Sequence, residues 1–113
     1  MIPIQTINFT TTTVNEDIMQ LASVKAQIKG VLGFSNDSDY TARFTANPVT
    51  GEKLGIRMSF DIIMSANNTV KINNKNTQDL IEGSAYSSEN ATDVYSLIIG
   101  TAGTGSISMN ILR

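Results

Sequence analysis

Three segments of the chain alternate apolar and polar residues with a period of two. They are residues 22–29, 40–46 and 56–64, and only Ile63 interrupts the last one. Residues that alternate in this way place apolar side chains on one face of a β-strand and polar side chains on the other. Residues 21–64 therefore predict three neighbouring strands, packed on one core through their apolar face.

Weaker patterns surround this central part. Residues 1–14 predict an extended arm, because Thr10–Thr13 form a β-branched run that favours a strand pairing with its own sheet or with a neighbouring subunit. Residues 15–17 predict a turn, with a helix through Ile18, Leu21, Ala22 and Lys25 as the alternative. Residues 47–52 predict a turn and residues 69–72 a short strand.

The Asn and Asp residues at 36–39 allow two interpretations, an Asx-stabilised turn or a calcium loop. The stretch lacks the central glycine and the distal glutamate of an EF-hand loop. We therefore expect the turn.

The tail, residues 88–113, also has two interpretations. With period two, residues 94–99 and 106–112 are the strands of a hairpin joined by the glycine-rich stretch 100–105. With helical spacing, Ala91, Val94, Ile98 and Ala102 form an apolar stripe after an N-cap at Ser88. The glycines and β-branched residues favour the hairpin, and a short C-terminal helical element is the alternative.

Together these patterns predict a mainly β protein with a single domain over residues 1–113. The expected architecture is one antiparallel sheet of about five or six strands with one basic polar face, and the alternative is an all-β sandwich. A chain of 113 residues is long enough for one core but not for two.

Composition removes several classes of chemistry. The chain has no cysteine and no histidine, so the usual thiolate nucleophile, the commonest general base and the commonest transition-metal ligands are missing. The tail glycines match neither the dinucleotide fingerprint nor a phosphate loop. No stretch approaches the roughly 20 apolar residues of a membrane span. We expect no enzymatic activity, no cofactor, no metal site and no membrane partner.

The polar positions of the three central segments are basic, although the chain as a whole carries a net charge of −2. Cations among hydroxyl side chains suit phosphate contacts, in which Lys and Arg supply charge and Ser and Thr supply hydrogen bonds. A half-buried sheet also shows such residues to water without binding anything. The candidates for nucleic-acid contact at these positions include Lys25, Lys29, Thr41, Arg43, Thr45, Arg57 and Ser59.

At residues 23–29, 40–45 and 57–64 the chain resembles the coat proteins of single-stranded RNA phages. The resemblance implies an antiparallel sheet that binds an RNA hairpin, a C-terminal helical clasp, and a homodimer that is the building block of a shell. It also implies which residues face the RNA: Lys25, Lys29, Thr41, Arg43, Thr45, Arg57 and Ser59. It implies a virion protein, assembled in the host cytoplasm, whose partners are further copies of itself and RNA. The glycine-rich tail departs from the family where the clasp is expected.

The alternative is a fimbrial subunit. In that class of protein the N-terminal strand completes a neighbour's incomplete sandwich by strand addition, and residues 4–13 are the candidate donor strand.

Overall fold

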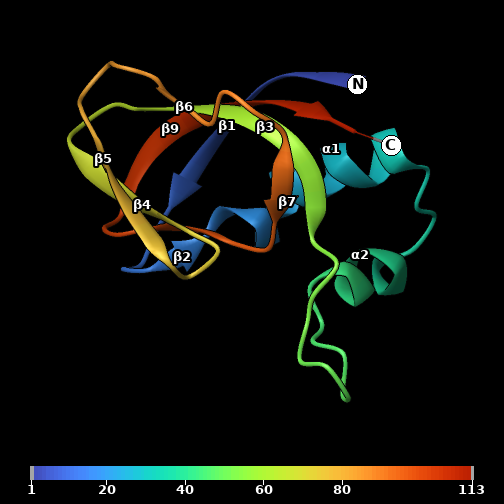
Figure 1. The fold of residues 1–113 in the computed structure, drawn as a ribbon. Coiled ribbons are helices and arrows are strands. Elements are labelled where there is room, and N and C mark those ends of the chain that lie inside the picture. Colours follow the sequence, from blue (N-terminus) through green and yellow to red (C-terminus); the bar gives the residue numbers. More distant parts are fainter. Residues whose placement is uncertain (1, 113) are drawn as a thin grey trace.

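The computed structural model describes residues 2–112, with side chains from residue 6 onward, as two antiparallel sheets and two short helices (Figure 1). The predicted mainly β class is confirmed. Met1 and Arg113, at the ends of the predicted arm and tail, lie outside the described residues. Sheet A contains β1 (Ile2–Thr11), β3 (Ile56–Met64), β6 (Tyr86–Ser87), β7 (Thr92–Val94) and β9 (Gly103–Ile111). Sheet B contains β2 (Glu16–Asp17), β4 (Asn68–Ile72), β5 (Asn76–Leu80) and β8 (Leu97–Ile99). The two helices are α1 (Ala22–Leu32) and α2 (Asp37–Arg43), and η1 (Ile18–Gln20) is a single 3-10 turn before α1.

Strand β9 is the centre of sheet A, because it pairs with β1 on one side and with β3 on the other. The second edge of β3 is shared by two short strands, β7 near its start and β6 near its end. Sheet B has the order β2-β8-β4-β5. The predicted N-terminal arm is thus a strand of its own chain's sheet.

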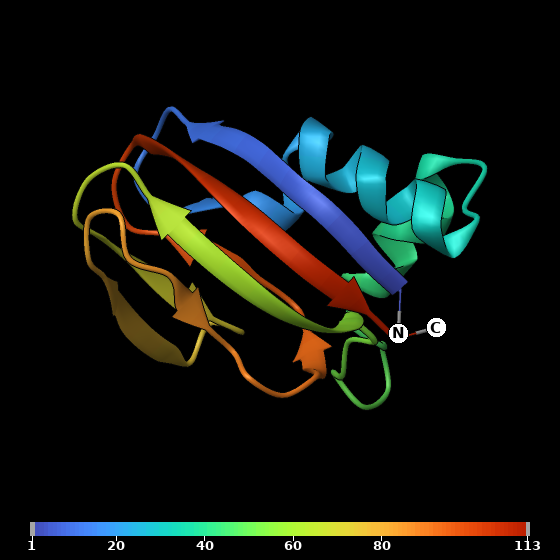
Figure 2. The same ribbon diagram turned by 90° about the horizontal axis from the view of Figure 1, so that it is seen from above.

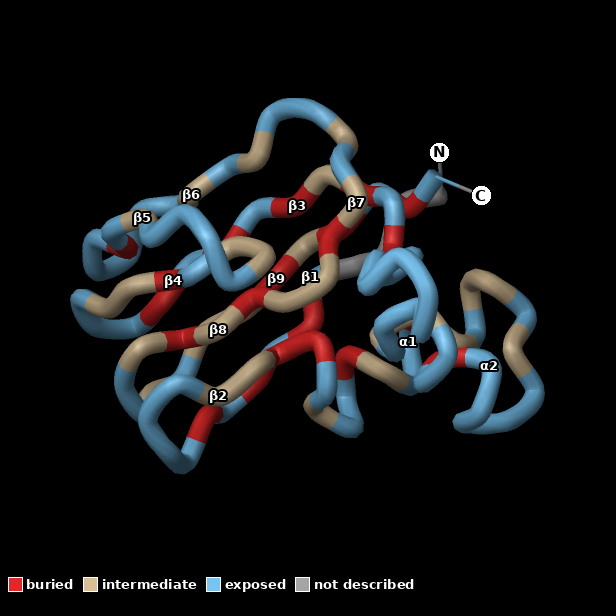
Figure 3. Tube along the Cα trace, turned by 60° about the horizontal axis from the view of Figure 1, so that its bottom comes forward, coloured by how far each residue is buried: buried red, intermediate tan, exposed pale blue. Residues whose placement is uncertain are grey.

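The core lies between the two sheets (Figures 1 and 2). Buried and exposed positions alternate along β3, which confirms the strand predicted at residues 56–64. Figure 3 shows buried positions along β3, β4, β8 and β9. The central core side chains come from every long strand of sheet A, from sheet B and from α1; they include Phe9, Val24, Ile28, Met58, Ile62, Val70, Leu97, Ile99, Ile107 and Met109.

The prediction of a strand over residues 22–29 is wrong, because this segment is part of α1. Val24 and Ile28 are buried and stand four residues apart, so they lie on one face of a helix. The two alanines that complete the alternation are exposed, and alanine is the strongest helix former. Gly33 then ends the helix in the left-handed conformation, with φ of 74°.

The prediction of a strand over residues 40–46 is also wrong, because residues 40–43 belong to α2. Asn36 caps this helix: its side-chain oxygen accepts a hydrogen bond from the Asp39 N–H at 3.1 Å. Asp37 and Asp39 lie in the first turn, where acidic side chains stabilise a helix. The Asn and Asp residues expected to form a turn are therefore a helix start.

The tail forms strands, as the first interpretation expected, but it does not form the predicted hairpin. Strand β8 belongs to sheet B and β9 to sheet A, so residues 100–102 carry the chain from one sheet to the other. Asn68 fixes this corner: its side chain accepts from the Thr101 N–H and donates to the Thr101 carbonyl, both at 3.1 Å. The crossing lets both strands turn an apolar face toward the same core.

We expect Gly105→Ala to destabilise the protein, because a methyl group at this position would lie 2.5 Å from the Ile63 carbonyl oxygen. Overpacking of this kind lowers the free energy of unfolding by about 1–3 kcal/mol. Gly30→Ala is the matched control, since open space surrounds Gly30 on α1. Urea unfolding should show a gain of about 0.5–1 kcal/mol for the control. Equal urea midpoints for Gly105→Ala and the native chain would contradict the close packing of Gly105 against the Ile63 carbonyl oxygen.

Candidate interaction surface

The residues predicted to contact RNA are divided between the helices and sheet A. Lys25 and Lys29 lie on α1, Thr41 and Arg43 lie on α2, Thr45 follows α2, and only Arg57 and Ser59 lie on β3. The predicted basic sheet face is therefore not formed. Its physical basis, neighbouring strands at residues 22–29 and 40–46, is replaced by two helices.

The three helical cations each have a partner within the α1–α2 region. Lys29 forms an ion pair with Asp37, and the hydrogen bond and charge of Lys29 hold the pKa of Asp37 below its usual range. Lys25 lies 5.9 Å from the centre of the Tyr40 ring. Arg43 lies 5.8 Å from the centre of the Phe34 ring. The contacts of Lys25 and Lys29 attach α1 to α2, and the contact of Arg43 attaches α2 to the segment that joins the helices.

The outer face of sheet A is a surface that no helix covers (Figure 2). Its side chains are mostly small hydroxyls and amides, and among those described the charged ones are Arg57, Asp61 and Asp93. Arg57 forms an ion pair with Asp93 at 3.4 Å. The described members of this face are Thr6, Asn8 and Thr10 on β1, Arg57, Ser59, Asp61 and Ile63 on β3, Thr104, Ser106, Ser108 and Asn110 on β9, and the partners of β3 on the short edge strands, Ser87 on β6 and Asp93 on β7.

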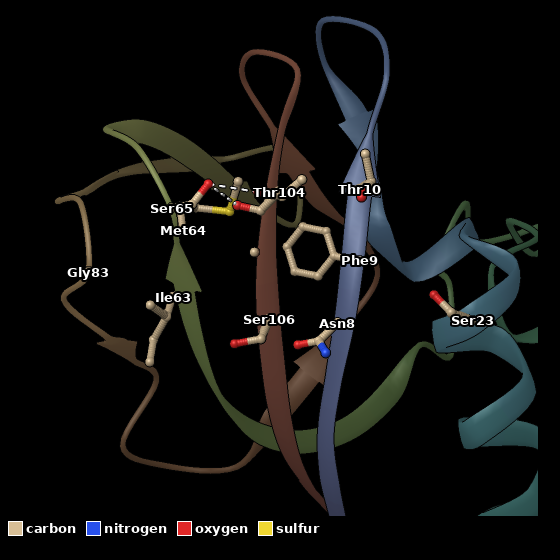
Figure 4. A pocket seen from close by; sticks show the side chains of 11 residues that line it. Asn8, Phe9, Thr10, Ser23, Ile63, Met64, Ser65, Gly83, Thr104 and Ser106 are labelled. Atoms are coloured by element: carbon tan, nitrogen blue, oxygen red, sulfur yellow. Dashed lines mark hydrogen bonds between the residues drawn. The ribbon is translucent and has the colours of Figure 1, made fainter.

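One end of this face is hollowed into a shallow pocket of about 650 Å³ (Figure 4). Ile63 is 39% exposed here, beside the hydroxyls of β9. Ser65 and Thr104 close one side, with their side-chain oxygens 2.8 Å apart. None of the residues that line the pocket is charged; they are Asn8, Phe9, Thr10, Ser23, Ile63, Met64, Ser65, Gly83, Thr104, Gly105 and Ser106.

The sequence contains a signal for this face that the prediction did not use. Thr104, Ser106, Ser108 and Asn110 alternate with buried residues of the predicted C-terminal strand. Small uncharged residues at every second position indicate a strand with one exposed face that is polar but carries few charged or bulky side chains. The pairing of β9 with β1 and β3 then extends this property across the sheet.

Asp17 is the one described carboxyl whose pKa is raised, and burial is the main cause. The same side-chain oxygen accepts hydrogen bonds from the Met19 and Leu97 N–H groups, both at 3.0 Å. Burial also raises the pKa of the neighbouring Tyr40 hydroxyl, which donates to the Met19 carbonyl oxygen. A raised pKa in a carboxyl is a common property of catalytic acids, but here each polar group is used to join η1, α2 and β8.

Within residues 2–112, no group of three or more acidic residues is placed to hold a metal ion. No helix among the described residues has the length and apolar character required to cross a membrane.

No protein-family model, curated protein or solved structure matches the chain.

We expect Asp17→Asn and Asp17→Ala to have opposite effects on the free energy of unfolding. Asn keeps the oxygen that accepts both N–H groups and removes the buried charge, whereas Ala leaves two donors unpaired, which costs about 1–3 kcal/mol. The raised pKa means that the folded state binds this proton more tightly than the unfolded chain. This contribution to stability is complete below the ordinary pKa of 3.8 and is lost as the pH rises through the folded value.

The stability of Asp17→Asn relative to the native chain should therefore increase from about pH 3 to about pH 7. Urea unfolding at both pH values measures this difference. A relative stability that falls with pH would show that the ionised carboxylate is stabilising.

Proposed function

We propose that the chain is a self-assembling structural subunit, with a virion coat as the assembly, and that copies meet through the outer face of sheet A. The observation that carries the proposal is the nearly uncharged, uncovered face of this sheet. Removing small hydroxyl and amide groups from water is much less costly than removing charges, provided that they find hydrogen bonds across the interface. Small side chains also let two surfaces approach closely.

The size of the face indicates how it would be used. Three strands of about nine residues, with about 3.3 Å per residue and about 4.8 Å between strands, present about 430 Å² per copy. Two such faces would bury about 900 Å², whereas stable interfaces bury about 1,200–2,000 Å². The face therefore suits a weak contact that is strengthened by other contacts in a shell.

The pairing of β1 favours the shell over the fimbrial alternative. Strand β1 already pairs with β9 from Ile2 to Thr11, and α1 runs along its other side (Figure 2). Donation of this strand to a neighbour would require the chain to give up this pairing first. A shell assembled through side chains leaves the sheet intact.

RNA contact stays a prediction. The helical positions of Lys25, Lys29 and Arg43 move the candidate surface from the sheet to the α1–α2 region. That region also carries Asp37 and Asp39, so any attraction to phosphate there is modest.

We expect Ile63→Arg to weaken self-association by at least about tenfold, since it places a charge among the uncharged residues at the pocket end of this face, where burial of a charge is unfavourable. Thr77→Arg on β5 of sheet B is the matched control, because Thr77 is also an exposed strand residue. Light scattering against concentration and electron microscopy of the purified chain measure assembly. A native chain that stays monomeric at every concentration would reject the proposed function.

The RNA prediction is tested in the same particles. An absorbance excess at 260 nm that falls in the Lys25→Ala, Arg43→Ala double variant would support RNA contact through the helices. An RNA content that does not change would remove this surface from consideration.

A further inference from the structure

The segment between α2 and β3 projects away from both sheets, as the green loop at the bottom of Figure 1 shows. Val49 at its tip is 90% exposed, and Leu54 on its returning arm is 65% exposed. A single exposed apolar residue is ordinary on a protein surface. An apolar residue at the tip of a projecting segment is different, because nothing in its own chain can cover it.

Hydrogen bonds from Asn47 hold this tip in one shape. Its side-chain oxygen accepts from the Val49 N–H at 2.8 Å and from the Thr50 N–H at 3.1 Å. Its backbone N–H donates to the Glu52 carbonyl oxygen, and its carbonyl oxygen accepts from the Gly51 N–H. Gly51 has φ of 74°, which a glycine adopts without strain. The tip is pre-organised, so its binding would cost little conformational entropy.

The base of the loop is fixed as well. The Gly55 N–H donates to the Arg43 carbonyl oxygen at 2.7 Å, joining the end of α2 to the start of β3. A side chain at Gly55 would lie 2.7 Å from the Val94 carbonyl oxygen. The loop therefore projects in a direction set by sheet A itself.

The tip and the shallow pocket lie at opposite ends of β3. The loop ends where β3 begins, at Ile56, and the pocket lies at Ile63 and Met64. A strand of this length separates them by about 25 Å, given about 3.3 Å per residue. The tip of one copy therefore cannot reach the pocket of the same copy.

We infer that the tip at Pro48–Val49 of one copy inserts into the pocket on the outer face of sheet A of the next copy. Residues 47–51 are uncharged, as are all the residues that line the pocket, so neither surface has a charge to desolvate. Ile63 in the pocket and Val49 on the tip supply apolar contact, and the surrounding hydroxyls can bond the loop backbone. This inference rests on the proposed function and specifies the contact that the sheet face alone leaves too small.

The geometry makes the contact heterologous, because the tip and pocket are different surfaces of the same subunit. Such contacts are not completed in a pair: they continue from copy to copy until a ring or shell closes, or they extend as a filament. The prediction is therefore an assembly that grows by tip-to-pocket addition.

The experiment uses one variant without a tip, Val49→Asp, and one with a blocked pocket, Asn8→Arg. Both residues are exposed, so both variants should fold. Each variant alone should associate at least about tenfold more weakly than the native chain, because desolvating a charge opposes binding. Val14→Asp is the matched control, since Val14 is 67% exposed on another loop, and it should assemble like the native chain.

Mixing the two variants gives the decisive result. One intact tip and one intact pocket remain in the mixture, so a one-to-one pair should form and should not grow further. Light scattering and size-exclusion chromatography of the mixture measure this pair. Two results would overturn the inference and leave the proposed function standing. In the first, the native chain assembles and Val49→Asp assembles equally well. In the second, the native chain assembles and the mixture of variants stays monomeric.

Discussion

The pairing of β9 with both β1 and β3 is the constraint on which the structure depends. It joins the first and last described strands and places residues from near both ends of the sequence in one sheet. Contacts of such large sequence separation form slowly, because loop-closure entropy opposes them before packing compensates. Once formed, this three-strand unit positions the apolar face that packs on sheet B, the polar face that remains outside, and the loop that enters β3.

Two small features allow this arrangement. Gly105 lets β9 approach the end of β3 more closely than any side chain would permit. Asn68 holds the corner at which the chain leaves sheet B for sheet A. Neither contributes much burial, but both lie at the start of β9, where the strand passes the end of β3. Because the pocket is built from the first residues of β9 and the last residues of β3, its shape follows from these two contacts.

The parts of the fold that could be predicted from the sequence are those where large apolar residues decide the pattern. In β3 the alternating positions are filled by bulky side chains, so only a strand buries them all. In α1 half of the alternating positions are alanine, which gains little from burial, and the spacing of Val24 and Ile28 then satisfies a helix equally well. For α2, the sequence analysis interpreted residues 36–39 as a turn, because Asn and Asp serve both turns and helix starts.

The predicted basic face is not formed, because it depended on residues 22–29 and 40–46 being strands. The uncharged face could not be predicted for another reason. It requires the pairing of Asn8 with Ser106, and of Ser106 with Ile63, and local sequence carries no information on partners so far apart. The tip at Val49 was visible as a turn, yet its exposure depends on how far α2 and β3 hold it from the sheets.

The edges of the two sheets explain why association through faces and loops is the more reasonable mode for this fold. Strand β1 is flanked by α1, and the edge beyond β3 is divided between β6 and β7, which are too short to template another chain. Strand β5, the edge of sheet B, carries polar residues and the exposed Asp79. Protected or polar edges of this kind prevent uncontrolled strand pairing. A subunit that must assemble in one geometry benefits from such edges, because contact is then restricted to surfaces whose shape, rather than backbone hydrogen bonding, selects the partner.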